Sequence, residues 1–512
     1  PRLPHQPRRA HSGAMTLGDL PAALEAARRG DRRGSLAEVS SKRLLALNLR
    51  KLGGEELRFT PRCYILPGDH ADDGHGPCGE YSDFVADFRA SQALAVLRRI
   101  AEPQRQRPTG EPVGARAQEA LNLAWEQPEG LHGREVPEIS WEQGPDARLP
   151  LSADVVVAAR VVAQRAVATC RCGGCLADVE VKEEEWALLS GFCPEADCSD
   201  LDVAAHQEEA ASLLAALPAE CQLPLLRANL WLLKPSSNGG GNGRGILVLD
   251  RLPRCPWQLL RWAAAVGRGG CAGASDAVDG CVIQKLVEQP QLLDRNLLLE
   301  HWPPDGCRPS GEEQPPTEPE AAGGPKVGAF FKYNLRFWLL LSLSDPPSAW
   351  LHQDSYADLA AQEFTSAPEP ASHITNLLRG DVSRGRGVFQ RHWSSSDLAA
   401  YFRHVRGGQD LYTESILPQA RAIIQAVVRA LVAAPSSLLE AGSGRLRRLG
   451  LDFLVDEDCT VWLIEFNVLR NEYGLKAPRG PGGDVKRRLA QRLIQDEEAL
   501  RAALAAGEPP PR

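Results

Sequence analysis

The pattern of apolar and polar residues predicts helices that alternate with short strands along most of the chain. Apolar residues recur at helical spacing in eight segments, and short apolar runs bounded by Gly, Pro or charged residues lie between them. Helices are predicted over 18–33, 40–52, 81–100, 153–167, 201–217, 398–405, 416–432 and 485–505. Strands are predicted over 59–67, 230–233, 246–249, 281–287, 337–343 and 350–356. This mixture indicates an α/β (α+β) protein.

A further stretch, 449–467, predicts a β-hairpin with polar groups on both arms. Asp452 is the one acid of the first arm, and Glu465 and Asn467 lie two residues apart in the second, on one face of a strand. Three converging oxygen ligands would suit Mg²⁺, which prefers hard oxygen donors. An ordinary hairpin with acids at its rim is the alternative.

A segment rich in Gly and Asn, 239–245, separates two predicted strands. Lys234 directly follows the first of them. The backbone N–H groups of such a loop can approach phosphate groups closely. The segment is not a Walker loop, because the Gly-Lys-Ser/Thr ending is missing and a strand follows it. A flexible hairpin loop is the alternative.

Two more groups of polar residues follow. Lys332, Asn334 and Arg336 alternate, which places them on one face of a strand. Two cations beside a phosphate loop would neutralise phosphate charge, whereas an edge strand with exposed cations is the alternative. Residues 373–376 offer hydroxyl and amide groups to a ribose or phosphate, or form a simple turn.

Composition narrows the class of protein. The 512 residues are 43% hydrophobic and 24% charged, with a net charge of −8, which predicts a globular protein that does not bind nucleic acid. The sequence contains no run of 18 apolar residues, so no membrane span is predicted.

The 13 cysteines are expected to be reduced thiols. Five of them between 170 and 198 could bind zinc, but their spacing fits no standard pair of zinc knuckles. Because the chain starts with Pro1 and its one Met is Met15, we expect a fragment or a non-native leader over 1–14.

These motifs, in this order, together with Gln284-Lys285, resemble those of the tubulin-tyrosine-ligase-like family, which has an ATP-grasp fold. The resemblance is strong over 230–475 and weak over 59–90, about half of the chain. It implies two α/β lobes around a nucleotide and a smaller N-terminal α/β domain.

The resemblance implies an ADP-forming ligase that requires ATP and Mg²⁺. A glutamate carboxylate of tubulin or of another acidic protein tail would take the γ-phosphoryl group, and the amine of a free amino acid would attack the acyl phosphate. The segment 338–356 most resembles the glycylating branch, which favours glycine. Glutamylation is one alternative. An inactive nucleotide-binding relative that serves as a cytoskeletal adaptor is another, because the family usually has Asp at the position of Asn334 and Arg at that of Gln353.

The resemblance also assigns candidate roles. The catalytic candidates are Lys332, Arg336 and Glu465. The candidates for binding ATP are Lys42, Lys234, Gly243, Arg244, Gly245, Ile246, Gln284, Lys285, Leu286, Val287, Lys332, Asn334, Arg336, His373, Thr375, Asn376 and Ile464. The metal candidates are Asp452, Glu465 and Asn467. We expect a monomer in the cytoplasm, on the cytoskeleton and the axonemes of cilia or flagella.

Composition and motifs together suggest a division of the chain. The predicted parts are a disordered leader (1–17), an N-terminal domain (18–100), a helical, Cys-containing insertion (101–220), a central ATP-grasp lobe (221–300), a disordered insertion (301–327), a C-terminal ATP-grasp lobe (328–480), and a C-terminal helix and tail (481–512).

Overall fold

The computed structural model describes about half of the chain. The described residues are 59–66, 80–102, 139–142, 151–192, 202–236, 246–267, 280–294, 297, 330–342, 348–360, 362–365, 370–375, 392–433, 446–469 and 481–506. The helices predicted over 18–33 and 40–52 lie outside these residues, as does the Gly/Asn-rich segment 239–245.

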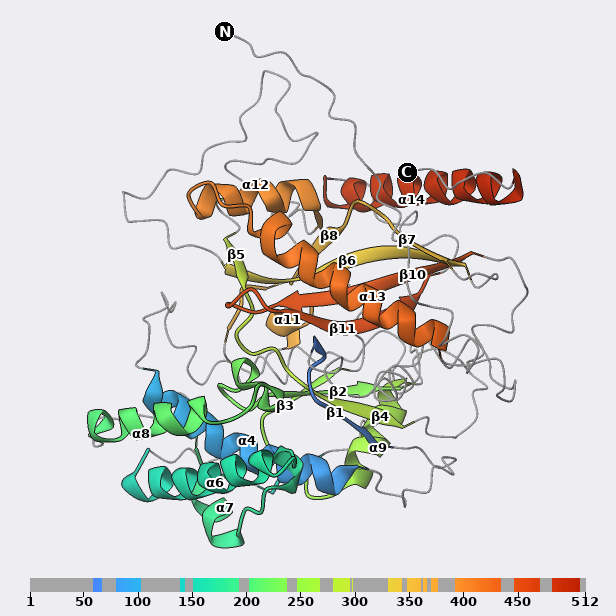
Figure 1. Ribbon diagram of the computed structural model, residues 1–512. Helices are drawn as coiled ribbons and strands as arrows, with labels where there is room; N and C mark the ends of the chain where they lie inside the picture. Colours follow the sequence, from blue (N-terminus) through green and yellow to red (C-terminus); the bar gives the residue numbers. More distant parts are fainter. Residues whose placement is uncertain are drawn as a thin grey trace, which may run out of the picture.

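Two antiparallel sheets, stacked one above the other in Figure 1, form the framework of the described residues. The four-stranded sheet has the order β1-β4-β2-β3, formed by β1 (Cys63–Leu66), β2 (Trp231–Pro235), β3 (Leu247–Leu249) and β4 (Cys281–Lys285). The seven-stranded sheet has the order β11-β10-β6-β8-β9, and β5 and β7 also pair with β6. Its strands are β5 (Leu292–Asp294), β6 (Phe330–Ser342), β7 (Ser348–Leu351), β8 (Tyr356–Leu359), β9 (His392–Ser394), β10 (Arg447–Val455) and β11 (Val461–Val468).

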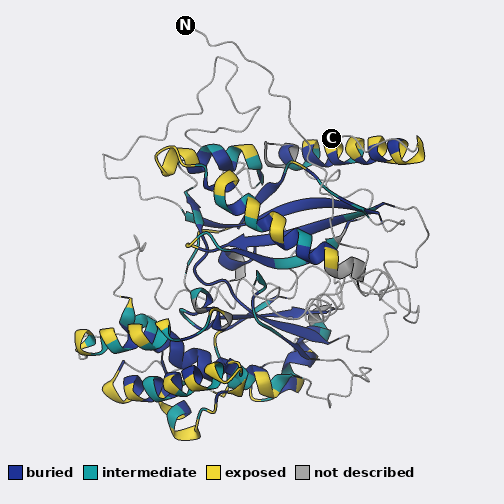
Figure 2. Ribbon diagram, in the orientation of Figure 1, coloured by how far each residue is buried: buried dark blue, intermediate teal, exposed yellow. Residues whose placement is uncertain are grey.

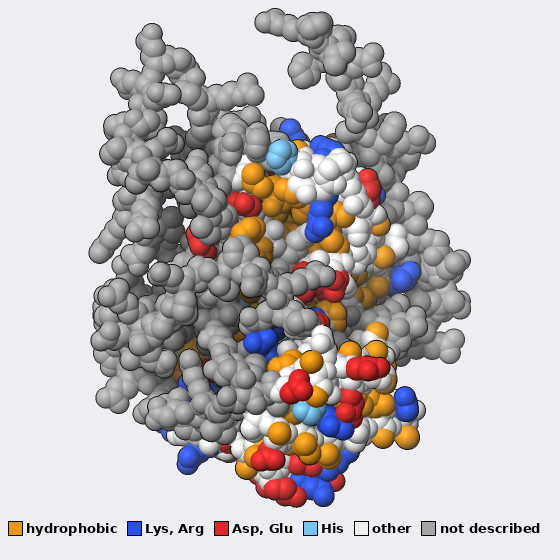
Figure 3. All heavy atoms as spheres, turned by 90° about the vertical axis from the view of Figure 1, so that its left-hand side faces the viewer, with side chains coloured by type: hydrophobic (Ala, Val, Ile, Leu, Met, Phe, Trp, Pro, Cys, Tyr) orange, Lys and Arg blue, Asp and Glu red, His pale blue; other side chains and the backbone are white. Residues whose placement is uncertain are grey.

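Helices pack against both sheets (Figure 1). Against the smaller sheet lie α4 (Tyr81–Ala101), α6 (Ala153–Arg171), α7 (Glu183–Leu189), α8 (Val203–Ala215), α9 (Pro256–Gly267) and the short turns η2 (Leu176–Asp178), η3 (Ala219–Cys221) and η4 (Leu223–Leu225). On the larger sheet, α12 (Ser395–Val405), the π-helical turn η6 (Tyr412–Ile416) and α13 (Leu417–Ala433) pack against one face. The last helix, α14 (Pro481–Ala506), packs against the other face, and α11 (Pro370–His373) lies between the sheets. On the face drawn in Figure 3, acidic and basic side chains are interspersed over the helical layer.

The long strand β6 explains how one sheet carries both a core and a polar face. Its odd-numbered residues, such as Leu335 and Phe337, join the core beneath α12 and α13. Its even-numbered residues face the other way: Lys332, Asn334 and Arg336 come first, and Trp338 follows beneath α14. All of them are buried, in agreement with the dark strands of Figure 2. The alternative of an edge strand with exposed cations is therefore wrong, because β10 and β8 pair with β6 on its two sides.

Several predicted elements change their bounds. The strand expected over 350–356 is two strands, β7 and β8. Between them His352 accepts a hydrogen bond from the Asp354 N–H at 3.1 Å, which closes a turn. The strand expected over 337–343 begins earlier, at Phe330, so the alternating cations lie within it. Among the described residues, no helix combines the length and the apolar character that a membrane crossing requires.

Candidate functional site

A buried ion pair joins the two central strands of the larger sheet on the face toward the smaller sheet. Arg336 on β6 lies directly opposite Asp452 on β10, and its guanidinium donates to both carboxylate oxygens, at 2.5 Å for the Nη2–Oδ2 contact. Both residues are at most 6% exposed. Burial raises the pKa of Asp452 despite the opposing effect of Arg336, and the charge of Glu465 raises it further.

The hairpin brings its three predicted oxygen donors together. Asp452 pairs with Glu465 across β10 and β11, and Asn467 Nδ2 donates to Asp452 Oδ2 at 3.4 Å. A β-bulge follows Asp452, which ends the regular alternation at the site. Glu465 and Asn467 are half-buried. These oxygens suit a hard cation, although Asp452 would have to share it with Arg336.

Two buried lysines come from different sheets. Lys234 at the end of β2 donates to the Oε1 atom of Gln284 on β4, and Lys332 on β6 donates to the backbone oxygen of Val287 at 3.1 Å. Burial, together with the charge of Lys234, lowers the pKa of Lys332 to about 7. Two neighbouring cations in a desolvated place repel one another, and an anion would relieve that repulsion.

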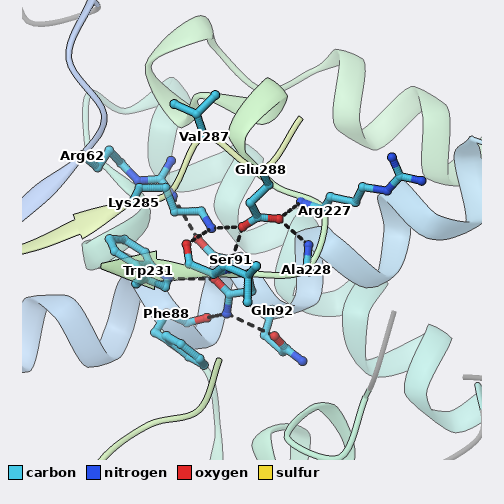
Figure 4. A network of polar contacts seen from close by, with 12 residues as sticks. Arg62, Phe88, Ser91, Gln92, Arg227, Ala228, Trp231, Lys285, Val287 and Glu288 are labelled. Carbon is cyan, nitrogen blue, oxygen red and sulfur yellow. Dashed lines mark hydrogen bonds and ion pairs between the residues drawn. The ribbon is translucent and has the colours of Figure 1, made fainter. Parts of the chain in front are cut away.

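Lys285 is the predicted site residue that the structure does not bring to these lysines. Adjacent residues of a strand point to opposite faces, so Lys285 turns away from Gln284 toward the helical layer. Its ammonium contacts the Glu288 carboxylate, donates to the Leu230 backbone oxygen at 2.8 Å, and lies 5.2 Å from the ring centre of Trp231. Figure 4 shows Lys285 and Glu288 at the centre of this network.

Glu288 holds the chain that connects the helical layer to β2. Its Oε2 atom accepts hydrogen bonds from the backbone N–H groups of Arg227, at 2.7 Å, and Ala228, while Oε1 accepts from Leu230 at 2.6 Å (Figure 4). Burial lowers the pKa of Lys285 to about 8, and Glu288 opposes that shift. The pair therefore fixes backbone positions next to Val287 and contributes no side chain to the site.

Two apolar clusters contain further predicted site residues. Ile246, Leu286 and Ile374 pack together in one cluster on the inner face of the smaller sheet. Val287 and Ile464 belong to a second cluster, around Trp462 of the hairpin. His373 and Thr375 flank Ile374 and are also buried. Several predicted site residues from both sheets thus face the same region.

Asp358 and His392 are buried charged neighbours of the site that the sequence did not single out. Asn334 on β6 lies directly opposite Asp358 on β8, which lies opposite His392 on β9. The His392 ring contacts the Asp358 carboxylate. Although burial acts to raise the pKa of Asp358, nearby cations, His392 first, lower it below its usual range. Gln353, where the family usually has Arg, lies on the exposed turn after β7 and not in the row formed by Asn334, Asp358 and His392.

Asn334 has an unusual position in this row. Its Nδ2 atom donates to Asp452 Oδ1 at 3.5 Å, but its buried Oδ1 atom has no hydrogen-bond partner among the described residues. Such an acceptor is costly to bury unless a ligand or water completes it.

Gly450 leaves room for Arg336. A Cβ atom at position 450 would lie 3.2 Å from Arg336 Cδ and 3.0 Å from Leu469 Cδ2. Because glycine has no side chain, the Arg336 side chain can pass next to position 450 on its way to Asp452.

The remaining candidates lie outside the described residues: Lys42, Gly243, Arg244, Gly245 and Asn376. So do two of the five clustered cysteines, Cys193 and Cys198. Within the described ranges, no three His, Cys, Asp or Glu side chains are grouped as metal ligands, and Cys170, Cys172 and Cys175 are reduced thiols.

Comparisons with known proteins identify the family of the chain. The sequence model of the Tubulin-tyrosine ligase family matches residues 194–469. The chain is 22% identical to Tubulin glycylase 3A of Drosophila melanogaster over 47% of this chain and 19% of that protein. It is 23% identical to Protein monoglycylase TTLL8 of Mus musculus over 85% of this chain and 46% of that protein. It is 25% identical to Probable tubulin polyglutamylase ttll-9 of Caenorhabditis elegans over 46% of this chain and 45% of that protein.

The chain therefore spans less than half the length of each of these relatives. The family match nevertheless includes most of the strands that carry the site and covers more than half of the 512 residues. Mixed helices and antiparallel sheets around the buried lysines are the ATP-grasp type of architecture, and the chain belongs to the tubulin-tyrosine ligase family.

Proposed function

We propose that this protein is an ATP-dependent ligase that joins a free amino acid, glycine first of all, to glutamate carboxylates of tubulin or of another acidic protein tail. The observation that carries the proposal is the buried pair of cations, Lys234 and Lys332, beside the Arg336–Asp452 ion pair. Two of the relatives named above are glycylases, which favours glycine over glutamate.

Each group has a chemical task in this proposal. Lys234 and Lys332 bind phosphate oxygens of ATP, and the apolar cluster of Ile246, Leu286 and Ile374 accepts the base. Oxygens of Asp452, Glu465 and Asn467 would hold Mg²⁺, which neutralises phosphate charge when it is bound. Arg336 stabilises negative charge on the acceptor carboxylate during phosphoryl transfer. The protein thus contributes position and charge.

The direct test is incubation of the protein with tubulin, ATP, Mg²⁺ and radiolabelled glycine, glutamate or tyrosine in separate reactions. Incorporation of glycine that requires ATP and is lost in Glu465→Gln is expected. Incorporation of glutamate alone would replace glycylation with glutamylation. A binding assay with ATP, run in parallel, separates a protein that binds nucleotide from one that also ligates.

A second candidate is a nucleotide-binding adaptor without ligase activity. Two observations favour it: Asn334 is an amide where the family usually has an acid, and both oxygens of Asp452 are already bound by Arg336. This candidate requires ATP binding and tubulin binding with no incorporation of any amino acid. In either case we propose a monomer that acts on the cytoskeleton in the cytoplasm, including the axonemes of cilia and flagella.

A further inference from the structure

Two cysteine thiols that are distant in sequence lie in contact in the helical layer, away from the candidate site. Cys170 is in the last turn of α6, and Cys221 ends the short turn η3, 51 residues later in the chain. Their sulfur atoms are 3.6 Å apart. A disulfide requires a sulfur–sulfur distance of about 2.05 Å, so side-chain rotation must bring them closer by about 1.6 Å.

Hydrogen bonds hold the backbone around Cys221 in place. The carbonyl oxygen of Cys221 accepts a hydrogen bond from Arg62, and the next residue, Gln222, receives one from the Arg62 N–H at 2.9 Å. Gln222 also donates to the Thr60 backbone oxygen at 2.7 Å. Cys170, in contrast, is half-buried in the last turn of α6, which ends at Arg171, and Gly173 two residues later has a φ of +87°.

We propose that Cys170 and Cys221 form a disulfide when the protein meets a two-electron oxidant such as oxidised glutathione. The bond would tie α6 to the segment that leads into the Glu288 network, whose backbone partners begin six residues after Cys221 at Arg227. This inference does not depend on the proposed ligase activity.

The chemistry proceeds by thiol–disulfide exchange and is balanced. The Cys170 thiolate attacks oxidised glutathione, which forms a mixed disulfide and expels one glutathione thiolate. Cys221 then loses its proton to solvent base and attacks the Cys170 sulfur, which expels the second glutathione. Two protein thiols are oxidised and one glutathione disulfide is reduced. Burial raises the pKa of Cys221, with a contribution from Cys170, so the second step should accelerate as the pH rises.

The test uses the full chain in buffers with increasing ratios of oxidised to reduced glutathione, followed by alkylation and non-reducing peptide mapping. We expect one peptide pair, Cys170 with Cys221, that is reversed by dithiothreitol and forms faster at pH 8.5 than at pH 7. The melting temperature should rise by roughly 5 °C, because the cross-link restricts the unfolded chain. Amide exchange over 219–230 should slow.

Matched variants separate the pair from its exposed neighbours. Cys170→Ser should abolish both the cross-linked peptide and the rise in melting temperature, whereas Cys172→Ser and Cys175→Ser should preserve them, because both of those thiols are exposed. Because the wild-type peptide map reads the bond directly, the result does not depend on whether Cys221→Ala folds. Glutathione on Cys170 without closure, or a bond between other cysteines in the folded protein, would overturn the proposal.

Discussion

Arg336 and Asp452 lie face to face across β6 and β10 and form a buried ion pair. Glu465, opposite Asp452 on β11, is half-buried by comparison. The two acids of the hairpin should therefore respond differently to the loss of charge.

We expect Asp452→Asn to lower the free energy of unfolding by about 3–5 kcal/mol, because it leaves the Arg336 charge buried without its partner. Glu465→Gln should cost less than about 1 kcal/mol and should abolish Mg²⁺-dependent ATP turnover. Urea unfolding and an ATP turnover assay measure the two effects. Wild-type turnover in Glu465→Gln would show that this residue is no catalytic metal ligand.

ATP binding should depend on pH through Lys332. Its pKa falls from an ordinary 10.5 to about 7 on folding, so between these values the unfolded chain binds more protons and stability rises with pH. A phosphate ligand favours the charged lysine, so ATP affinity should fall above pH 7 by up to about tenfold per pH unit.

Calorimetric titration at pH 6.5 and 8.5 measures this slope. Lys332→Met should bind weakly at both values and lose most of the slope, while the exposed control Lys182→Met should retain it. An equal slope in wild type and Lys332→Met would assign the pH dependence to another group.

Asn334→Asp should make the protein more dependent on Mg²⁺. A new carboxylate there would lie beside Asp452 and directly opposite Asp358, so like charges would lower the melting temperature without metal. Added Mg²⁺ should raise it by more than in the wild type, and ligation should increase. Gln353→Arg, on the exposed turn, should change neither quantity. If both variants behave alike, proximity to Asp452 is not the determinant.

The pair of Lys285 and Glu288 should act as a structural unit. Glu288→Gln should cost about 3–5 kcal/mol, because Lys285 stays buried without its carboxylate partner. The double variant with Lys285→Met should lose less than the sum of the single changes. Glu183→Gln is the matched control: its exposed ion pair with Arg89 should be worth less than about 1 kcal/mol. Additive losses in a double-mutant cycle would contradict the coupling.

The alternation of side chains explains which parts of the site could be predicted from the sequence. A period of two placed Lys332, Asn334 and Arg336 on one face and set Asp452 against the second arm of its hairpin, because both patterns are local. The same period places Gln284 and Lys285 on opposite faces of β4, although both were expected at the ATP site. The sequence does not reveal which of the two faces the site, because Lys285 is held on the other face by contacts with Trp231 and Glu288 that form only in the folded chain.

Asp358 and His392 could not be found in this way. Their place beside Asn334 follows from the register of β6, β8 and β9, which long connections join and no short-range signal specifies. The buried acid Asp456 is similar: its carboxylate accepts from the Thr460 N–H at 2.8 Å and the Trp462 indole at 2.9 Å, a role that a polar turn does not reveal. Lys42 and the Gly/Asn-rich segment remain predictions.

Gly450 has a consequence for how this sequence can change over evolutionary time. A methyl group at 450 would lie 3.0 Å from the Leu469 side chain and 3.2 Å from that of Arg336, so a replacement there requires both side chains to shift by a few tenths of an ångström. Positions 336, 450 and 469 should therefore change together in descendants of this sequence, with a larger residue at 450 favoured where the other two side chains are smaller.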